Sequence, residues 1–182
     1  MLSEHKYQKI PQVPTTAVEV YRMLPEGTRC EVYFNEMVML SPRSSACQLL
    51  TSEINVRLYL FLQEINMGKV IPAPIDVYFT NYDSAVQSDS VVLLNDNLDK
   101  IQTDGIYGTP DIIIQILPGN QDNTTDRKRS LYEKAGVKEY FLIDPENKKT
   151  TLLTLNASGL YEQTHEEIGI LKSSLLSCNI AF

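Results

Sequence analysis

The stretch Ile112-Ile113-Ile114-Gln115-Ile116-Leu117 is apolar at every position but one. A strand with one face in water alternates apolar and polar residues, so a run that is apolar on both faces predicts a central strand covered on both sides. Gln115 is the exception. Burying an amide without a partner costs roughly 2–7 kcal/mol, so Gln115 is expected to be hydrogen-bonded in the core, to bind a metal ion or to lie at a functional surface.

Helical and strand patterns surround this run. A helix is predicted from Thr124 or Thr125 to Gly136, and the longest helix carries apolar residues at helical spacing from Leu49 to Ile65. A short helix is predicted from Thr15 or Thr16 to about Leu24. A hairpin is expected over Arg29 to Leu40, with Asn35 in a left-handed conformation. Further strands are predicted at Val70-Ile71, Ile75 to Phe79, Ser90 to Leu94, Glu139 to Ile143 and Leu152 to Leu155, followed by strand and loop from Gly159 to Phe182.

This order predicts a mixed α/β or α+β domain built on one central sheet, with no second core. At roughly 150 residues per domain, the 182 residues form one domain over residues 15–182, preceded by a polar N-terminal arm over residues 1–14.

Composition narrows the function classes. Sixteen Lys and Arg against 23 Asp and Glu give a net charge of −7, which argues against a high-affinity, non-specific polyanion binder. No run approaches the length of a membrane span, and Met1 to Lys9 lack the apolar block of a signal peptide. Three widely spaced cysteines indicate reduced thiols rather than disulfides or a zinc site. A cytoplasmic protein is expected.

Two groups of polar residues are candidates for chemistry. Strand alternation places Asp111 and Gln115 on one face about 13 Å apart, too far to share one ion. A partner for Gln115 must therefore come from a neighbouring strand, and Asp89, directly before Ser90 to Leu94, is the obvious acid. The alternative for Asp89 is an ordinary turn residue at the start of a strand.

The second group is the basic run Arg127-Lys128-Arg129 at the start of the predicted helix. Such a run is commonly a solvated face. Cations at a helix N-terminus nevertheless oppose the helix dipole, so a counter-charge from phosphate or from carboxylates is expected.

Two longer strings resemble a known family. The first is Gly108-Thr-Pro-Asp-Ile-Ile-Ile-Gln-Ile-Leu-Pro118, and the second is Lys128-Arg-Ser-Leu-Tyr-Glu-Lys-Ala-Gly-Val-Lys-Glu-Tyr-Phe-Leu-Ile-Asp-Pro145. Both resemble the Uma-type family of restriction endonucleases, within the PD-(D/E)xK nuclease superfamily. The likeness extends upstream to Glu31-Val-Tyr-Phe-Asn-Glu-Met-Val-Met-Leu-Ser-Pro42 and to Ser88-Asp89, and covers about Thr15 to Leu155.

The resemblance implies a restriction-endonuclease-like mixed β-sheet flanked by helices, with a Mg²⁺ site that cuts phosphodiester bonds in DNA. By match, the catalytic residues are Asp89, Gln115 and Lys128, and Asp89 and Gln115 are the metal ligands. Glu31 is an auxiliary acid. Tyr132, four residues after Lys128, is expected to line the same cleft or to pack in the core.

The chain departs from the family pattern at important positions. Gln115 replaces the family's glutamate, which removes one of two charges that would hold the metal ion, and Leu117 stands where the E-x-K lysine would be. Cys47 stands where the family usually has a histidine. A neutral amide oxygen can still coordinate Mg²⁺, but affinity is expected to fall. The pattern indicates an eroded site.

Two functions remain open. One is a Mg²⁺-dependent DNA endonuclease with Gln115 as a ligand, and the other is an inactive nuclease-fold protein that binds nucleic acid or acts in homo-oligomeric protein interaction. A single cleft holding Arg127, Lys128 and Arg129 beside Asp89 and Gln115 would favour the nuclease. The resemblance also implies a homodimer or higher homo-oligomer. The apolar tail from Leu171 to Phe182 is expected either to form an interface strand or to cover its own sheet edge.

Overall fold

The computed structural model describes residues 13–25, 27–117 and 124–182. Its centre is the predicted strand β9 (Ile112–Ile116), in which every residue is buried. The neighbouring strands β6 (Ser90–Leu94) and β10 (Glu139–Ile143) lie on either side of it, antiparallel and parallel respectively. The prediction of a central strand covered on both faces is therefore confirmed.

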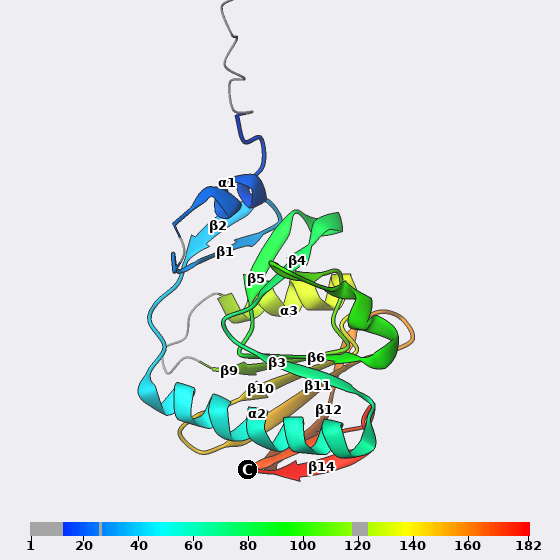
Figure 1. The fold of residues 1–182 in the computed structure, drawn as a ribbon. Coiled ribbons are helices and arrows are strands. Elements are labelled where there is room, and N and C mark those ends of the chain that lie inside the picture. The colour runs from blue at the N-terminus through cyan, green and yellow to red at the C-terminus, as the bar shows by residue number, and fades with distance from the viewer. Residues whose placement is uncertain (1–12, 26, 118–123) are drawn as a thin grey trace, which may run out of the picture.

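Strand β9 belongs to a six-stranded sheet in the order β12-β11-β10-β9-β6-β3. Its outer members are β3 (Gly68–Pro72), β11 (Lys149–Leu155) and β12 (Tyr161–Ile168). Helix α2 (Ser45–Ile65) covers one face, and helix α3 (Thr124–Ala135) lies on the other (Figure 1). Because β9 and β10 are parallel, the chain needs a crossover between them, and α3 supplies it.

Within the described residues a second six-stranded sheet is present, so the prediction of one central sheet was wrong. Its order is β2-β1-β5-β4-β8-β7. The strands are β1 (Cys30–Tyr33), β2 (Glu36–Met39), β4 (Asp76–Phe79), β5 (Ser84–Gln87), β7 (Ile101–Gln102) and β8 (Gly105–Tyr107). The short 3₁₀ helix η1 (Thr80–Tyr82) joins the paired strands β4 and β5, and η2 (Asn95–Lys100) joins β6 of the first sheet to β7 of the second.

The chain changes sheet between β3 and β4, at Pro72-Ala73-Pro74. Proline has no N–H to donate to a strand ladder, so this segment interrupts pairing and β4 pairs with β5 instead of continuing beside β6. Periodicity alone predicts a single sheet because it does not identify β5, which pairs with both β1 and β4.

Local signals located the helix starts and the hairpin well. Thr16 caps α1 (Ala17–Met23) in a complete capping box with Glu19. The hairpin of β1 and β2 turns at Phe34 and Asn35, both with positive φ, as predicted for Asn35. On α2, however, Leu49 is exposed although it was predicted on the apolar face.

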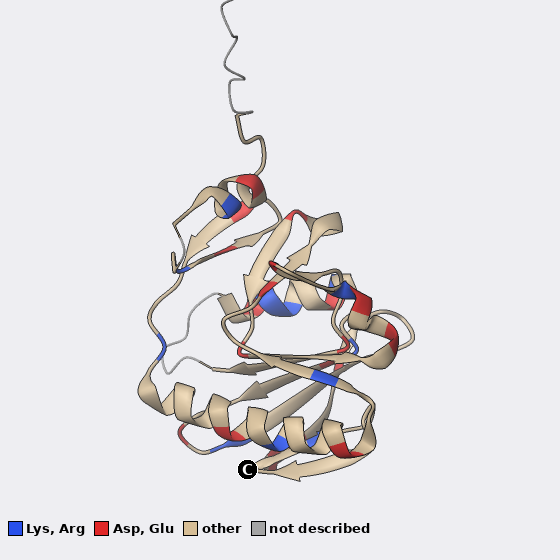
Figure 2. Ribbon diagram, viewed as in Figure 1, with Lys and Arg blue, Asp and Glu red and all other residues tan. Residues whose placement is uncertain are grey.

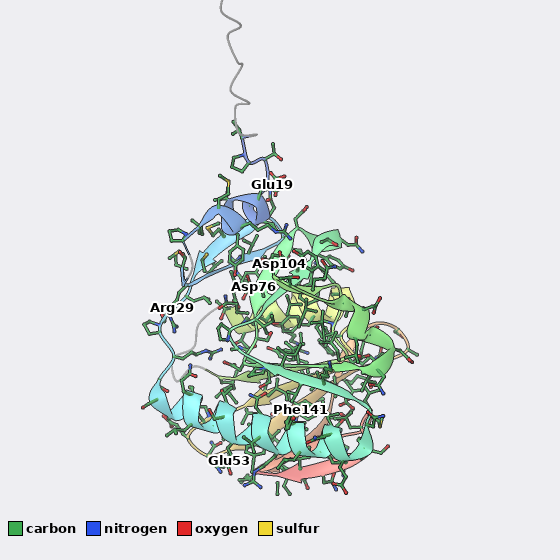
Figure 3. All side chains as sticks on the ribbon, viewed as in Figure 1. Glu19, Arg29, Glu53, Asp76, Asp104 and Phe141 are labelled. Carbon is green, nitrogen blue, oxygen red and sulfur yellow. The ribbon has the colours of Figure 1, made fainter. Side chains whose placement is uncertain are left out.

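Two apolar layers hold the helices against the first sheet. Phe141 packs with Leu58 and other α2 residues on one side of that sheet (Figure 3). On the other side, Leu131 and Tyr132 of α3 pack between this sheet and the second one. Helix α3 therefore lies where the two sheets face each other.

The C-terminal tail packs within its own chain. Strands β13 (Ile170–Ser173) and β14 (Cys178–Ala181) pair with each other, and Leu171 and Ile180 are buried in the core under α2. Of the two expectations for the tail, the structure favours coverage of its own chain.

No helix among the described residues is long and apolar enough to cross a membrane. Most of the predicted N-terminal arm, residues 1–12, lies outside the described part of the chain.

Candidate functional site

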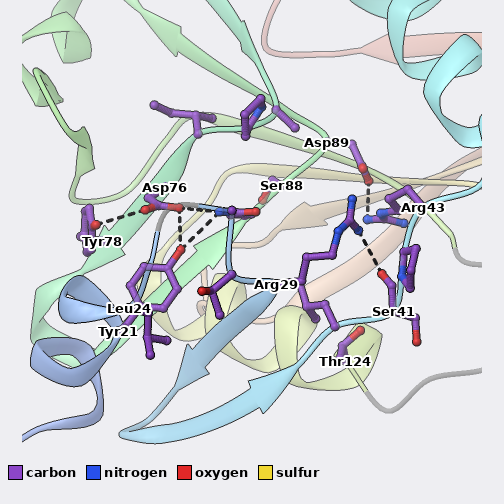
Figure 4. Close-up of a pocket in the computed structure, with 18 of the residues that line it drawn as sticks. Tyr21, Leu24, Arg29, Ser41, Arg43, Asp76, Tyr78, Ser88, Asp89 and Thr124 are labelled. Carbon is purple, nitrogen blue, oxygen red and sulfur yellow. Dashed lines mark hydrogen bonds and ion pairs between the residues drawn. The ribbon is translucent and has the colours of Figure 1, made fainter.

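A cavity of about 950 Å³ opens between the N-terminal hairpin, the ends of β4 to β6 and the start of α3 (Figure 4). Asp89, Gln115 and Lys128 all line it. Asp89 directly precedes β6, Gln115 lies on β9, and Lys128 lies on α3. The structure therefore brings the sequence-predicted residues together, as the resemblance implied.

Asp89 lies at the start of β6, beside the C-terminal end of β9. Its Oδ2 atom accepts a hydrogen bond from the backbone N–H of Ile116 at 2.8 Å. The same oxygen forms an ion pair with Nη2 of Arg43 at 2.9 Å. Burial raises the pKa of Asp89, while the positive charges of Arg43 and Lys128 and the Ile116 N–H act against that rise. Asp89 is not an ordinary turn residue, because its side chain links the start of β6 to Ile116 of β9 and to Arg43 in the loop before α2.

Gln115 is a satisfied polar group. The Tyr140 hydroxyl donates a hydrogen bond to Oε1 of Gln115. Nε2 of Gln115 donates to the Thr125 hydroxyl at 3.4 Å. Strand alternation directs Gln115 toward α3, as it does the buried Ile113. Of the three roles predicted from sequence, hydrogen bonding in the core is the one these contacts supply.

Lys128 is buried, with 3% of its side chain exposed, beside a carboxylate. Its Nζ lies 2.9 Å from Oε1 of Glu31 and donates to the backbone carbonyl of Gln87 at 2.7 Å. Glu31, fully buried on β1, also accepts from the Gln87 N–H at 2.7 Å and from the Tyr33 hydroxyl. Glu31 thus lies behind Lys128 and neutralises it.

Tyr132 packs in the core rather than lining the cavity. It is fully buried, and its hydroxyl lies 2.8 Å from Oγ of Ser88. Its ring meets Tyr140 edge-on at 5.0 Å between centroids. Burial raises the pKa of Tyr132 well above its ordinary value, so the hydroxyl stays protonated and serves as a hydrogen-bonding group.

The basic run at the start of α3 divides. Lys128 lines the cavity, whereas Arg127 pairs with the exposed Glu36 at 2.7 Å and neither Arg127 nor Arg129 is among the lining residues. The expected counter-charges for Arg127 and Lys128 are therefore carboxylates. Among the described residues, the single cleft that would have favoured the nuclease, with all three cations beside Asp89 and Gln115, is not found.

Other arginines, missed in the sequence, supply positive charge to the cavity. Arg22 donates to the Tyr107 hydroxyl at 2.6 Å, and Arg29 donates to the Ser41 carbonyl at 3.2 Å. Both arginines are exposed and both acceptors are neutral. Arg43, from the loop before α2, completes the set (Figure 4). Each is an isolated arginine in a loop or short helix, so no periodicity could have identified it.

The donor set does not fit a Mg²⁺ site. Mg²⁺ is usually held in proteins by one or two carboxylates together with water or phosphate oxygens. Of the two predicted ligands, Asp89 is ion-paired with Arg43 and Gln115 is neutral, with its amide oxygen bonded to Tyr140. Within the described ranges, no three His, Cys, Asp or Glu side chains are grouped so that they could hold a metal ion. The charged and polar side chains of the site are instead paired with one another: Asp89 with Arg43, Lys128 with Glu31, and Gln115 with Tyr140.

Comparison with known proteins identifies the family and the fold. The profile of a family described as "Uma2: Putative restriction endonuclease" matches residues 11–175. Among solved structures, a putative nuclease belonging to DUF820 from Anabaena variabilis is similar, with a TM-score of 0.71 and 15% sequence identity over 90% of this chain and 92% of that chain. A search of curated proteins gave no match.

The fold is that of a restriction-endonuclease-like nuclease. Because the profile spans nearly the whole chain, the protein belongs to the Uma2 family of restriction-endonuclease-like proteins.

Proposed function

We propose that this protein is a nuclease-fold protein that binds nucleic acid in the Asp89 cavity without cutting it. The observation that carries the proposal is the pairing of the two residues at the metal-ligand positions. Arg43 neutralises Asp89, and Tyr140 holds the amide oxygen of Gln115. A cation that polarises a scissile phosphate would need ligand oxygens from these two residues, and both side chains already have partners.

The cavity keeps features that suit a phosphate-bearing ligand. Arg22 and Arg29 line it with their guanidinium groups hydrogen-bonded to neutral oxygens. Guanidinium groups bind phosphate oxygens through paired N–H donors. With a net charge of −7 on the chain, binding rests on these local cations, so its affinity is modest and strongly dependent on salt.

Nucleic-acid binding is tested by fluorescence anisotropy with end-labelled single- and double-stranded DNA over a series of salt concentrations. Arg29→Ala is expected to weaken binding and to reduce the slope of log K against log salt by about 0.7–0.9 for each phosphate that the variant no longer neutralises. Arg57→Ala is the matched control, because Arg57 pairs with Glu53 on α2 and does not line the cavity. Equal effects of the two substitutions, or no saturable binding at low salt, would contradict the proposal.

The Mg²⁺-dependent DNA endonuclease is the second candidate. It is favoured by the convergence of Asp89, Gln115 and Lys128 on one cavity. Mg²⁺-dependent cleavage that disappears in Asp89→Ala would establish it and overturn the non-cutting proposal. If neither binding nor cleavage is found, homo-oligomeric protein interaction is the remaining function. In all three cases we expect the protein to act in the cytoplasm as a homodimer or larger homo-oligomer.

A further inference from the structure

Arg43 makes two contacts that join the ends of separate strands. Its Nη1 donates to the carbonyl of Ile116 on β9 at 2.7 Å, and its Nη2 donates to Oδ2 of Asp89 at 2.9 Å. The Ile116 N–H donates to the same Oδ2. One guanidinium thus closes a ring with a carboxylate and one residue of the central strand.

This ring is largely withdrawn from solvent. The side chain of Arg43 is 22% exposed and that of Asp89 is 9% exposed. Exposed ion pairs contribute little, but removing one partner of a buried pair leaves an uncompensated charge and is strongly destabilising. Arg43 is therefore placed to stabilise the ionised form of Asp89.

The charges at these positions balance without an added ion. A pair of carboxylates at positions 89 and 115 would call for a divalent cation, but here Gln115 is neutral and Asp89 alone carries a negative charge. The single positive charge of Arg43 matches it. A divalent cation on the Asp89 carboxylate would also lie close to the guanidinium that is paired with Oδ2, and like charges at short range repel.

We propose that Arg43 replaces the metal ion of this site, so that Gln115 and Arg43 together form a metal-independent version of it. The inference rests on the proposed function in one respect, since both require a cavity that holds no divalent ion. It goes further, because it assigns Arg43 as the positioning residue that excludes the ion and keeps the ends of β6 and β9 together.

Metal affinity is the direct test, with Mn²⁺ followed by electron paramagnetic resonance on the full chain. The native protein and Gln115→Glu are expected to show no saturable Mn²⁺ binding, because Arg43 remains on Asp89. The double variant Arg43→Ala/Gln115→Glu is expected to bind one Mn²⁺ per chain at least about tenfold more tightly than Gln115→Glu, since ligand charge governs the affinity of hard cations. Adding Asp89→Ala should abolish that binding.

The melting temperature is a second measurement of metal binding, and it also shows whether each variant folds. Mn²⁺ should raise the melting temperature of the double variant and leave that of the native protein unchanged. If Arg43→Ala fails to fold, Arg43→Gln in the same background keeps a donor for the Ile116 carbonyl and removes the charge. Arg57→Ala/Gln115→Glu is the matched control and should behave as Gln115→Glu does.

The inference is overturned if the native protein or Gln115→Glu binds Mn²⁺ as tightly as the double variant. It is also overturned if folded Arg43 variants carrying Gln115→Glu show no increase in affinity. Failure of the proposed function is recognised separately, because an absence of DNA binding in the anisotropy experiment leaves the Mn²⁺ results unchanged.

Discussion

At the scale of single residues, the buried pair of Lys128 and Glu31 is the clearest case of a motif residue with a structural role. Its atoms lie 2.9 Å apart with almost no exposure of either side chain. Lys128→Met leaves Glu31 buried without a cation, so we expect a loss of about 3–5 kcal/mol in the free energy of unfolding, measured by urea denaturation.

The matched control for this prediction is the double variant Lys128→Met/Glu31→Gln. Neutralising both partners removes the unpaired charge, so its loss should fall short of the sum of the two single losses by about 0.5–3 kcal/mol. Additive losses would mean that the two side chains do not stabilise each other.

We expect Asp111 to contribute strongly to the loss of folding stability at acidic pH. Burial alone would raise its pKa, but donors on Lys138, Leu94 and Asn97 outweigh burial and hold the pKa below the ordinary value. A lowered folded-state pKa gives stability that is present above the unfolded pKa of about 3.9 and is lost as pH falls through the folded value.

The expected result is that Asp111→Asn loses about 1–3 kcal/mol at neutral pH and loses less than the native protein does on further acidification below about pH 4. Chemical denaturation at a series of pH values measures both effects. Asp99→Asn, at an exposed position, is the control. An unchanged acid dependence in Asp111→Asn would contradict the assignment.

Individual site residues were only partly predictable from the sequence. Gln115 drew attention as the one amide in a central strand, and Asp89 as the acid directly before a neighbouring strand. The resemblance supplied the role of Lys128. Arg43 was not found, because it has no motif and acts through tertiary contacts to residues 46 and 73 positions away. Such long-range pairing of charges leaves no local pattern.

At the scale of elements, Glu139 joins the C-terminal hairpin to β10. Its Oε2 accepts from the Ser173 hydroxyl at 2.6 Å, and its Oε1 accepts from the backbone N–H groups of Ser174 and Leu175 at 2.8 and 2.9 Å. Glu139→Ala leaves the buried Ser173 hydroxyl and two partly buried backbone N–H groups without their acceptor, so we expect a loss of about 2–4 kcal/mol in the free energy of unfolding. Faster hydrogen exchange in β13 and β14 should accompany it.

Substitution of Ser173 and Ser174 separates the contribution of a serine side chain from that of a backbone N–H group. Ser173→Ala should reproduce part of the loss, because its side chain donates to Glu139. Ser174→Ala should have almost no effect, because Ser174 contributes only its backbone N–H to Glu139. Unchanged exchange in the hairpin of Glu139→Ala would show that Glu139 does not hold it.

Elements with strong local signals were predicted more reliably than their assembly. Helix α3 begins at Thr124 and ends before Gly136, as the sequence indicated, and Gly136 has the positive φ that glycine adopts readily after a helix. The division into two sheets was not predicted, because it depends on the pairing of β5 with both β1 and β4. Tertiary packing determines that pairing, and the periodicity of the sequence does not show it.

At the scale of the whole molecule, basic and acidic residues are interspersed over both sheets and the helices (Figure 2). With a net charge of −7 on the chain, nucleic-acid contacts should concentrate at the cavity arginines. This distribution agrees with modest, salt-sensitive binding.

The homo-oligomer implied by the family stays a prediction. Because β13 and β14 pack on their own chain, removal of the tail is expected to unfold the protein rather than to separate subunits. Light scattering after size exclusion should give a mass of at least twice the chain mass of 20.6 kDa. A monomer at every concentration tested would contradict this expectation.

Cleavage of plasmid and single-stranded DNA by excess protein, with Mg²⁺ or Mn²⁺, tests the central claim most directly. The native protein and Asp89→Ala should leave the DNA intact to the same extent, because Arg43 neutralises Asp89 and position 115 carries no charge. Native cleavage that disappears in Asp89→Ala would contradict the account and show that Gln115 serves as a working metal ligand.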